Sequence, residues 1–226
     1  MQWQTLKGIL RIAYRYEVES YKKAAVDLLE YMFPRNVMRW HEIAEQNLNG
    51  QSPVVISGAA DFFSVVNVMA ELGLDHIRYT ALYDCTQEST AELLQGAQRQ
   101  DGSVEKLNPD VIRGCINARS RLSMRNMQLL NSLAENLDAL GCKAAPKPRC
   151  RITRRMVVND ILRDMDNRDL YNPIRRLPWK ELFRRYTADE PTICASCQDR
   201  MEKAYNEGCQ DILDNLPSYY NIAEDA

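Results

Sequence analysis

The sequence has few of the residues, and none of the common motifs, from which enzymes build an active site. Only two histidines, His41 and His76, occur in 226 residues. Neither stands at a recognised motif spacing from a nucleophile, and the G-x-S-x-G, P-loop and H-E-x-x-H motifs are all missing. We therefore expect no enzyme: no catalytic residue, no residue that binds an organic cofactor, and no small-molecule substrate.

Long hydrophobic runs and an export signal are also missing. No apolar run approaches the ~18–20 residues that cross a bilayer. The N-terminal residues lack the basic flank, apolar centre and small-residue cleavage site of a signal peptide. We expect an intracellular protein of the cytoplasm or nucleus with no membrane contact. In that reducing environment its seven cysteines would serve as core residues or metal ligands rather than as disulfides.

What the sequence does contain is the periodicity of helices. Charged residues make up 27% and hydrophobic residues 45% of the chain, which is ordinary for a globular protein. Leu6, Ile9, Leu10 and Ala13 follow the i, i+3, i+4, i+7 spacing of an amphipathic helix, and no segment alternates for long enough to predict a strand. We predict an all-α protein. Its expected parts are a helical hairpin over 1–33, an α-helical bundle over 34–141 and a small cysteine-stapled helical module over 142–226.

Turn and cap residues subdivide the expected bundle. The stretch from Pro34 to Pro53 is predicted to be a linker, and Ser57 is placed to cap the N-terminus of the next helix. Asn108, followed by Pro and Asp, is the clearest helix start in the chain, because Pro in the first turn loses no hydrogen bond. The long helix that begins there is expected to end at Gly141.

Four cysteines form the most informative pattern. Cys194 and Cys197 make a C-x-x-C pair, whose two thiolates can converge on one metal ion, and Cys142 and Cys150 supply a second pair upstream. Four such ligands would close a tetrahedral site around one structural zinc ion. The seven residues between Cys142 and Cys150 exceed the common zinc-finger spacings, so buried thiols without a metal, or a redox-active C-x-x-C, remain alternatives.

Charge is divided into two opposed blocks. Residues 143–185 contain 13 Lys or Arg and 5 Asp or Glu, whereas residues 189–226 contain 2 and 9. Such blocks most often neutralise each other on a folded surface. The alternative is a basic patch for an acidic partner or nucleic acid. The net charge of −2 argues against nucleic acid, and no aromatic residues are interleaved for base stacking. The arginines concerned are Arg149, Arg151, Arg154, Arg155, Arg175, Arg176, Arg184 and Arg185.

The order of features along the chain resembles the region that follows the BTB core in the fungal BTB/POZ-domain proteins of mushroom-forming species. The segment Leu6–Val18 is similar to the passage that closes a BTB domain. Met32–Pro34 matches the family's Phe-Pro, Ala81–Cys85 its Ala-Leu-Tyr and cysteine, and Leu93–Gly96 its "leucine-leucine-x-glycine". Ile112–Leu137 corresponds to the family's long Arg-rich helix.

The closing segment of that family is matched in part. The matching residues are Cys142, Cys150, Cys194, Cys197, Gly208, Leu216, Pro217 and Tyr219. The chain departs from the family's arginine, tryptophan and phenylalanine at Cys209, Leu213 and Tyr220. These departures affect the expected packing of the last helix and leave the cysteine set intact.

The resemblance implies a function. It implies a non-enzymatic adaptor that binds protein partners, such as a ubiquitin-ligase scaffold or a second copy of itself, with the BTB core expected to precede Met1. The first hairpin would then expose an interaction patch around Leu6, Ile9, Leu10 and Ala13. The resemblance also favours zinc at the four cysteines. The alternative function is a zinc-dependent regulator that contacts nucleic acid through the Arg-rich region.

Overall fold

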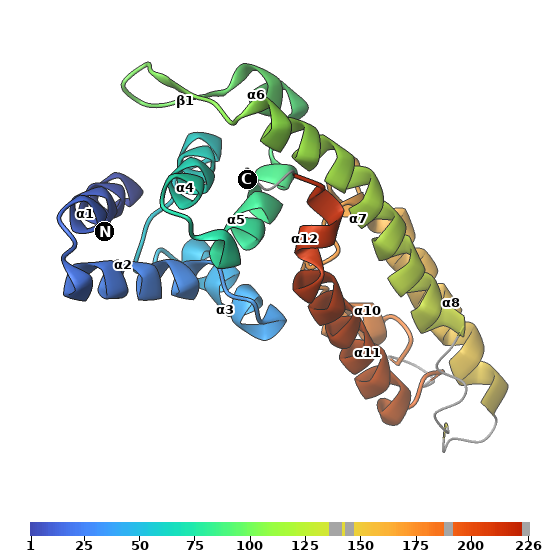
Figure 1. The fold of residues 1–226 in the computed structure, drawn as a ribbon. Coiled ribbons are helices and arrows are strands. Elements are labelled where there is room, and N and C mark those ends of the chain that lie inside the picture. Colours follow the sequence, from blue (N-terminus) through green and yellow to red (C-terminus); the bar gives the residue numbers. More distant parts are fainter. Residues whose placement is uncertain (136–141, 143–146, 188–191, 223–226) are drawn as a thin grey trace. The chain divides into compact units, whose positions relative to one another are not determined.

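The computed structural model describes residues 1–135, 142, 147–187 and 192–222, most of which lie in helices (Figure 1). The prediction of an all-α protein is confirmed, apart from the short antiparallel pair β1 (Ala97–Gln98) and β2 (Val104–Glu105). None of the described helices combines the length and hydrophobicity needed to cross a bilayer. In chain order the helices are α1 (Trp3–Arg15), α2 (Glu19–Met32), α3 (Val37–Leu48), α4 (Ala59–Glu71), α5 (Asp75–Gln87), α6 (Thr90–Gln95), α7 (Pro109–Glu135), α8 (Lys147–Asp164), α9 (Asn167–Leu170), α10 (Trp179–Arg184), α11 (Ala195–Asp214) and α12 (Leu216–Tyr220).

The chain forms two compact units. Unit 1 comprises Met1–Arg119 and Leu213–Ala226, and unit 2 comprises Ser120–Ile212. Helices α7 and α11 each contribute residues to both units, because neither helix breaks where one unit gives way to the other. The predicted boundaries after residues 33 and 141 therefore do not coincide with those of the units. The predicted helix end at Gly141 lies outside the described residues.

The core of unit 1 is made by two pairs of packed helices, α1 with α2 and α4 with α5, and α1 also packs on α4. Trp3, Phe63 and Tyr83 are among the largest fully buried side chains. An ion pair of 2.6 Å between Arg11 Nη2 and Glu71 Oε2 joins α1 to α4 at the surface. Apolar burial therefore supplies the main cohesion of this unit, with polar contacts at its edge.

The expected interaction patch on the first hairpin is not an exposed surface. Leu6, Leu10 and Ala13 are at most 2% exposed, and Ile9 is half-buried. The prediction that this face is open to a partner is wrong, because the face packs on α2 and α4 within the same unit. The apolar residue that α1 does expose is Ile12.

The expected linker from Pro34 to Pro53 contains a helix, α3. The Asn36 side chain caps it by accepting a hydrogen bond of 3.0 Å from the backbone N–H of Arg39. Val37, His41 and Ile43 of α3 are buried. The sequence analysis missed this helix because its buried residues are sparse, do not follow one i, i+3, i+4, i+7 stripe and include a histidine.

Helix α4 begins one residue later than predicted. Gly58, not Ser57, occupies the N-cap position, with a φ of 80° that favours glycine. The backbone N–H of Ser57 donates instead to the Asp61 carboxylate at 2.8 Å. Asp61 thus closes the first turn of α4 in place of the predicted Ser57 cap.

The segment after α11 completes unit 1. Tyr220 of α12 is fully buried, and its hydroxyl lies 3.0 Å from the Thr86 Oγ1 on α5. On α7, a Cβ added at Gly114 would lie 2.8 Å from the Ile222 Cγ1, so glycine allows this close approach. Unit 1 is therefore built from segments at both ends of the described chain.

Unit 2 relies on specific contacts between helices. The buried Asn126 of α7 donates to the carbonyls of Asp169 and Leu170 at 3.1 and 3.0 Å, which satisfies a polar side chain in the core. A Cβ added at Gly208 of α11 would lie 2.2 Å from the Leu129 Cδ1 of α7. Gly208 therefore leaves room for the Leu129 side chain where α7 packs on α11 in this unit.

Candidate metal centre

The four predicted cysteines lie in one place in unit 2. Cys150 lies in the first turn of α8, Cys194 immediately precedes α11, and Cys197 lies in the first turn of α11. Cys142 completes the group, and the four Sγ atoms all lie within 4.8 Å of one another. The structure confirms that these residues form a single cluster able to hold a metal ion.

The spacing of the sulfur atoms suits tetrahedral zinc. With Zn–S bonds of about 2.3 Å, a tetrahedral site places its sulfur atoms about 3.8 Å apart. The Cys142 and Cys194 Sγ atoms are 3.8 Å apart, and the whole group lies within the 4.8 Å limit. The donor set therefore fits Zn²⁺ with only small movements.

Two helix N-termini contribute to the electrostatics of the cluster. The first turns of α8 and α11 carry the positive ends of their helix dipoles, which stabilise a nearby thiolate. The backbone N–H of Cys194 also donates to the Cys150 Sγ at 3.5 Å, and the Arg200 guanidinium donates to the Cys197 Sγ at 3.3 Å. These donors would offset the negative charge that four thiolates bring to one metal ion.

Burial has the opposite effect on the thiols when no metal is bound. It raises the pKa of Cys197 to about 12, with hydrogen bonds from the Cys197 thiol to Cys194 and Cys142 adding to the shift, and it raises the pKa of Cys150. Without a metal these two residues are therefore neutral thiols at pH 7. A bound cation deprotonates coordinating thiols outright, so metal binding must release protons.

Contacts outside the cluster hold its two helices in place. Thr153 of α8 donates from its hydroxyl to the Thr192 carbonyl at 3.1 Å, and Thr192 in turn donates to the Tyr186 carbonyl. The Tyr186 hydroxyl donates to the Asp160 carboxylate of α8 at 2.6 Å. Burial raises the pKa of Tyr186 to about 12, and the hydrogen bond from Tyr186 lowers the pKa of Asp160. This chain of contacts connects α8 to the segment before Cys194.

With a zinc ion bound by all four cysteines, the cluster would be a structural site rather than a catalytic one. Four thiolates fill a tetrahedral zinc site and leave no position for a substrate or a reactive water. A redox C-x-x-C normally follows a strand in a βαβ unit, and the described residues of unit 2 contain no strand. The other cysteines, Cys85, Cys115 and Cys209, are buried elsewhere.

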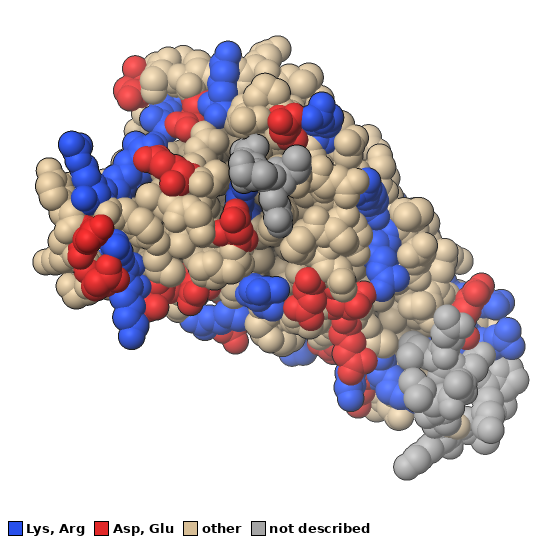
Figure 2. Space-filling view, viewed as in Figure 1, with Lys and Arg blue, Asp and Glu red and all other residues tan. Residues whose placement is uncertain are grey.

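The two charge blocks are paired in part within themselves. In the basic block, Arg163 lies 2.6 Å from the Asp160 carboxylate, and Arg175 forms an ion pair with Asp169. Figure 2 shows basic and acidic side chains interspersed over the face in view. The basic residues of 143–185 are thus partly neutralised by acidic residues of the same block.

Two residues that support the cluster were missed in the sequence. Arg200 and Thr153 each stand three residues after a ligand cysteine in a helix, a spacing that puts both members on one helix face. That spacing could have identified them. The role of Thr153 also depends on Thr192, which no local pattern connects to it.

Comparisons of the chain with protein-family models, with curated proteins and with solved structures found no match. The resemblance to BTB/POZ proteins therefore stays a prediction.

Proposed function

We propose that the four-cysteine cluster binds one structural zinc ion and that the protein is a non-enzymatic module for protein interactions. The observation that carries the first part is the convergence of four thiols at the beginnings of two helices. Closure of such a site ties together segments that are far apart in the sequence, and its binding free energy adds to the stability of the fold.

The metal proposal is tested by elemental analysis of the purified chain. We expect about one zinc per chain, lost on substitution Cys194→Ser and retained on Cys115→Ala, which removes a buried thiol outside the cluster. Tetrahedral sulfur sites also accept iron, so the analysis must cover both metals. A folded chain that contains neither metal, and binds no added Zn²⁺, would reduce the cluster to four core thiols.

The interaction proposal is supported by the outer face of α8, the helix that begins at the cluster. Ile152 and Met156, one turn apart, are 58% and 46% exposed, and Arg151 and Arg155 beside them are exposed. Exposed apolar side chains surrounded by cations suit a protein partner that presents acidic groups around an apolar centre. The resemblance to BTB/POZ proteins, including their ubiquitin-ligase scaffolds and self-association, points in the same direction.

This proposal is tested by comparing the partners and the oligomeric state of matched variants. Ile152→Glu should abolish retention of a specific partner, or concentration-dependent self-association measured by sedimentation. Met124→Glu alters an equally exposed residue of α7 and should leave both unchanged. A wild-type chain that is strictly monomeric and retains the same proteins as Ile152→Glu would contradict the role of this face.

A second candidate is nucleic-acid binding through the same helix, because Arg149, Arg151 and Arg155 are all exposed. Phosphate contacts are strongest at low salt. A gel-shift assay with duplex DNA and with RNA at low ionic strength therefore decides the question. Binding that weakens steeply with salt and with Arg155→Ala would favour this candidate, and absence of binding would eliminate it.

A further inference from the structure

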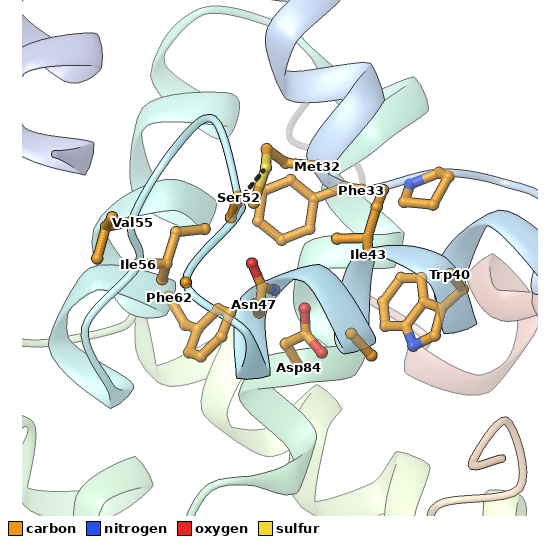
Figure 3. Close-up of a pocket in the computed structure, with 13 residues that line it drawn as sticks. Met32, Phe33, Trp40, Ile43, Asn47, Ser52, Val55, Ile56, Phe62 and Asp84 are labelled. Carbon is orange, nitrogen blue, oxygen red and sulfur yellow. Dashed lines mark hydrogen bonds between the residues drawn. The ribbon is translucent and has the colours of Figure 1, made fainter. Parts of the chain in front are cut away.

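Unit 1 contains a small apolar pocket that the proposed function does not use. Its volume is about 290 Å³, which is at the lower end of the roughly 300–1,000 Å³ typical of ligand sites. Phe33 and Ile43 in its lining are buried, and Trp40, Ile56 and Phe62 in its lining are half-buried (Figure 3). The size and lining suit a compact apolar group rather than a nucleotide or a large cofactor.

One acidic side chain faces this apolar lining. Asp84 of α5 is among the residues that line the pocket, and Figure 3 shows its carboxylate between Phe62 and Trp40. Among the described residues, the Asp84 carboxylate has no hydrogen-bond or ion-pair partner. Asp84 is a half-buried residue and lines the pocket. A carboxyl group is therefore available to a ligand in a largely apolar setting.

The environment of Asp84 disfavours its charge. Burial raises the pKa of Asp84 to about 8, and the nearby Glu88 adds to the shift. An unpaired carboxylate among aromatic and aliphatic side chains lacks the hydration that would stabilise it. A bound cation would supply the missing counter-charge, in a place where solvent screens it less than at the open surface.

The aromatic residues favour the same kind of ligand. The indole of Trp40 packs edge-on against Tyr83, with ring centroids 5.6 Å apart, so the indole is held in place at the pocket wall. Aromatic faces attract ammonium groups, most strongly when the ammonium is shielded from water. A hydrogen bond between charged groups is also about twice as strong as one between neutral groups, so an ammonium should be preferred over a hydroxyl.

We propose that this pocket binds a small apolar amine, with its ammonium group on the Asp84 carboxylate and its hydrocarbon body against Phe33, Ile43 and Phe62. The acid fixes the charge of the ligand, and the volume limits its size to a short aromatic or aliphatic body. The proposal is independent of the metal centre, because every residue of the pocket belongs to unit 1.

The probe is phenethylamine, titrated into the full chain at pH 8.5, above the pKa of Asp84, so that the carboxylate is ionised while the amine is still an ammonium. Binding is followed by NMR at the indole N–H of Trp40. That resonance is assigned with the variant Trp40→Phe. Two probes of similar shape are compared: the neutral 2-phenylethanol and the anionic 3-phenylpropionate. We expect the amine to bind at least about tenfold more tightly than the alcohol, which corresponds to roughly 1.4 kcal/mol, and the acid not to bind.

Matched variants assign the preference to Asp84. Asp84→Asn keeps the shape of the side chain and removes its charge, so it should weaken the amine about tenfold and leave the alcohol unchanged. Asp75→Asn removes an exposed carboxylate from the same helix and should change neither. Ala44→Phe enlarges an exposed residue at the pocket and should weaken both the amine and the alcohol.

Three results would overturn the proposal. The first is equal affinity of the wild-type chain for the amine and the alcohol. The second is an Asp84→Asn variant that binds the amine like Asp75→Asn. The third is no shift of the Trp40 resonance up to roughly 10 mM amine, where even a weak site of a few kcal/mol would fill. Thermal melts of each variant check that the fold is retained.

Discussion

Different kinds of contact stabilise the interior of each unit. Helix α4 in unit 1 buries Phe63, Val65, Val66, Val68 and Met69 in a nearly continuous apolar run. Helix α8 in unit 2 buries Cys150, Thr153, Arg154 and Asp160 together with its apolar residues. Apolar burial is non-directional, whereas thiols, hydroxyls and charged groups must meet particular partners to be stable when buried. The stability of unit 2 should therefore depend on a few specific contacts and, if the four cysteines bind the proposed zinc ion, on that ion most of all.

Metal removal should produce the largest difference in stability between the two units. Chelation, or Cys197→Ser, is expected to cost unit 2 several kcal/mol, because structural zinc contributes folding free energy directly. Hydrogen exchange should then show loss of protection at the amides of α8 and of α11 up to residue 212. The amides of α4 and α5 should keep theirs. An equal loss of hydrogen-exchange protection in both units would mean that the two units unfold cooperatively.

A core truncation in unit 1 should give the opposite pattern. Phe63 is fully buried, and Phe63→Ala is expected to cost about 3–5 kcal/mol through lost burial and the cavity left behind. Denaturant unfolding measures the loss, while elemental analysis should find the metal content unchanged. A fall in bound zinc would show that the cluster depends on the core of unit 1.

Asp84 should make unit 1 sensitive to pH. Its pKa is about 8 when folded, against a reference value of 3.8, so between these values the folded chain holds a proton that the unfolded chain has released. The unfolding free energy should therefore fall as the pH rises through this window, by on the order of 1–3 kcal/mol after allowance for solvent access. In urea unfolding at pH 5 and pH 8.5, Asp84→Asn should remove much of this decline and Asp75→Asn should not.

The smallest expected changes in stability come from replacing one glycine by alanine in each unit, and they have opposite signs. Gly8 of α1 has nothing within 4 Å of an added Cβ, so Gly8→Ala should stabilise unit 1 by up to about 1 kcal/mol through helix propensity. Gly208→Ala places its Cβ against Leu129 and should destabilise unit 2 by about 1 kcal/mol or more. Calorimetric melting temperatures of the two variants test the pair. A higher melting temperature for both variants would mean that α7 and α11 accommodate the added Cβ at Gly208 without loss of stability.

The sequence predicted the parts of the structure that depend on local patterns. Apolar periodicity predicted α1 in unit 1, whereas α3 and α12 were not predicted. Asn108 correctly marked the start of α7. The cysteine spacing predicted the members of the cluster, because a C-x-x-C pair allows two thiols to converge on one point and a second pair can complete the set.

Features that depend on long-range packing could not be predicted in the same way. The periodicity of Leu6, Leu10 and Ala13 predicted an apolar face but not the partner that covers it. Asp84 stands in an otherwise apolar stretch of α5, and only the fold shows that this acid faces a pocket. Helix α3 was missed because its few buried residues follow no single helical stripe and include a histidine.

The contact between Thr86 and Tyr220 joins residues 134 positions apart in the chain. Unit 2 is therefore an insertion between two segments of unit 1. During synthesis the ribosome must release all of unit 2 before unit 1 can gain its last helix. Prompt folding of the insertion would shorten the effective loop that unit 1 has to close. The metal cluster would then affect how quickly unit 1 is completed, although unit 1 contains none of its ligands.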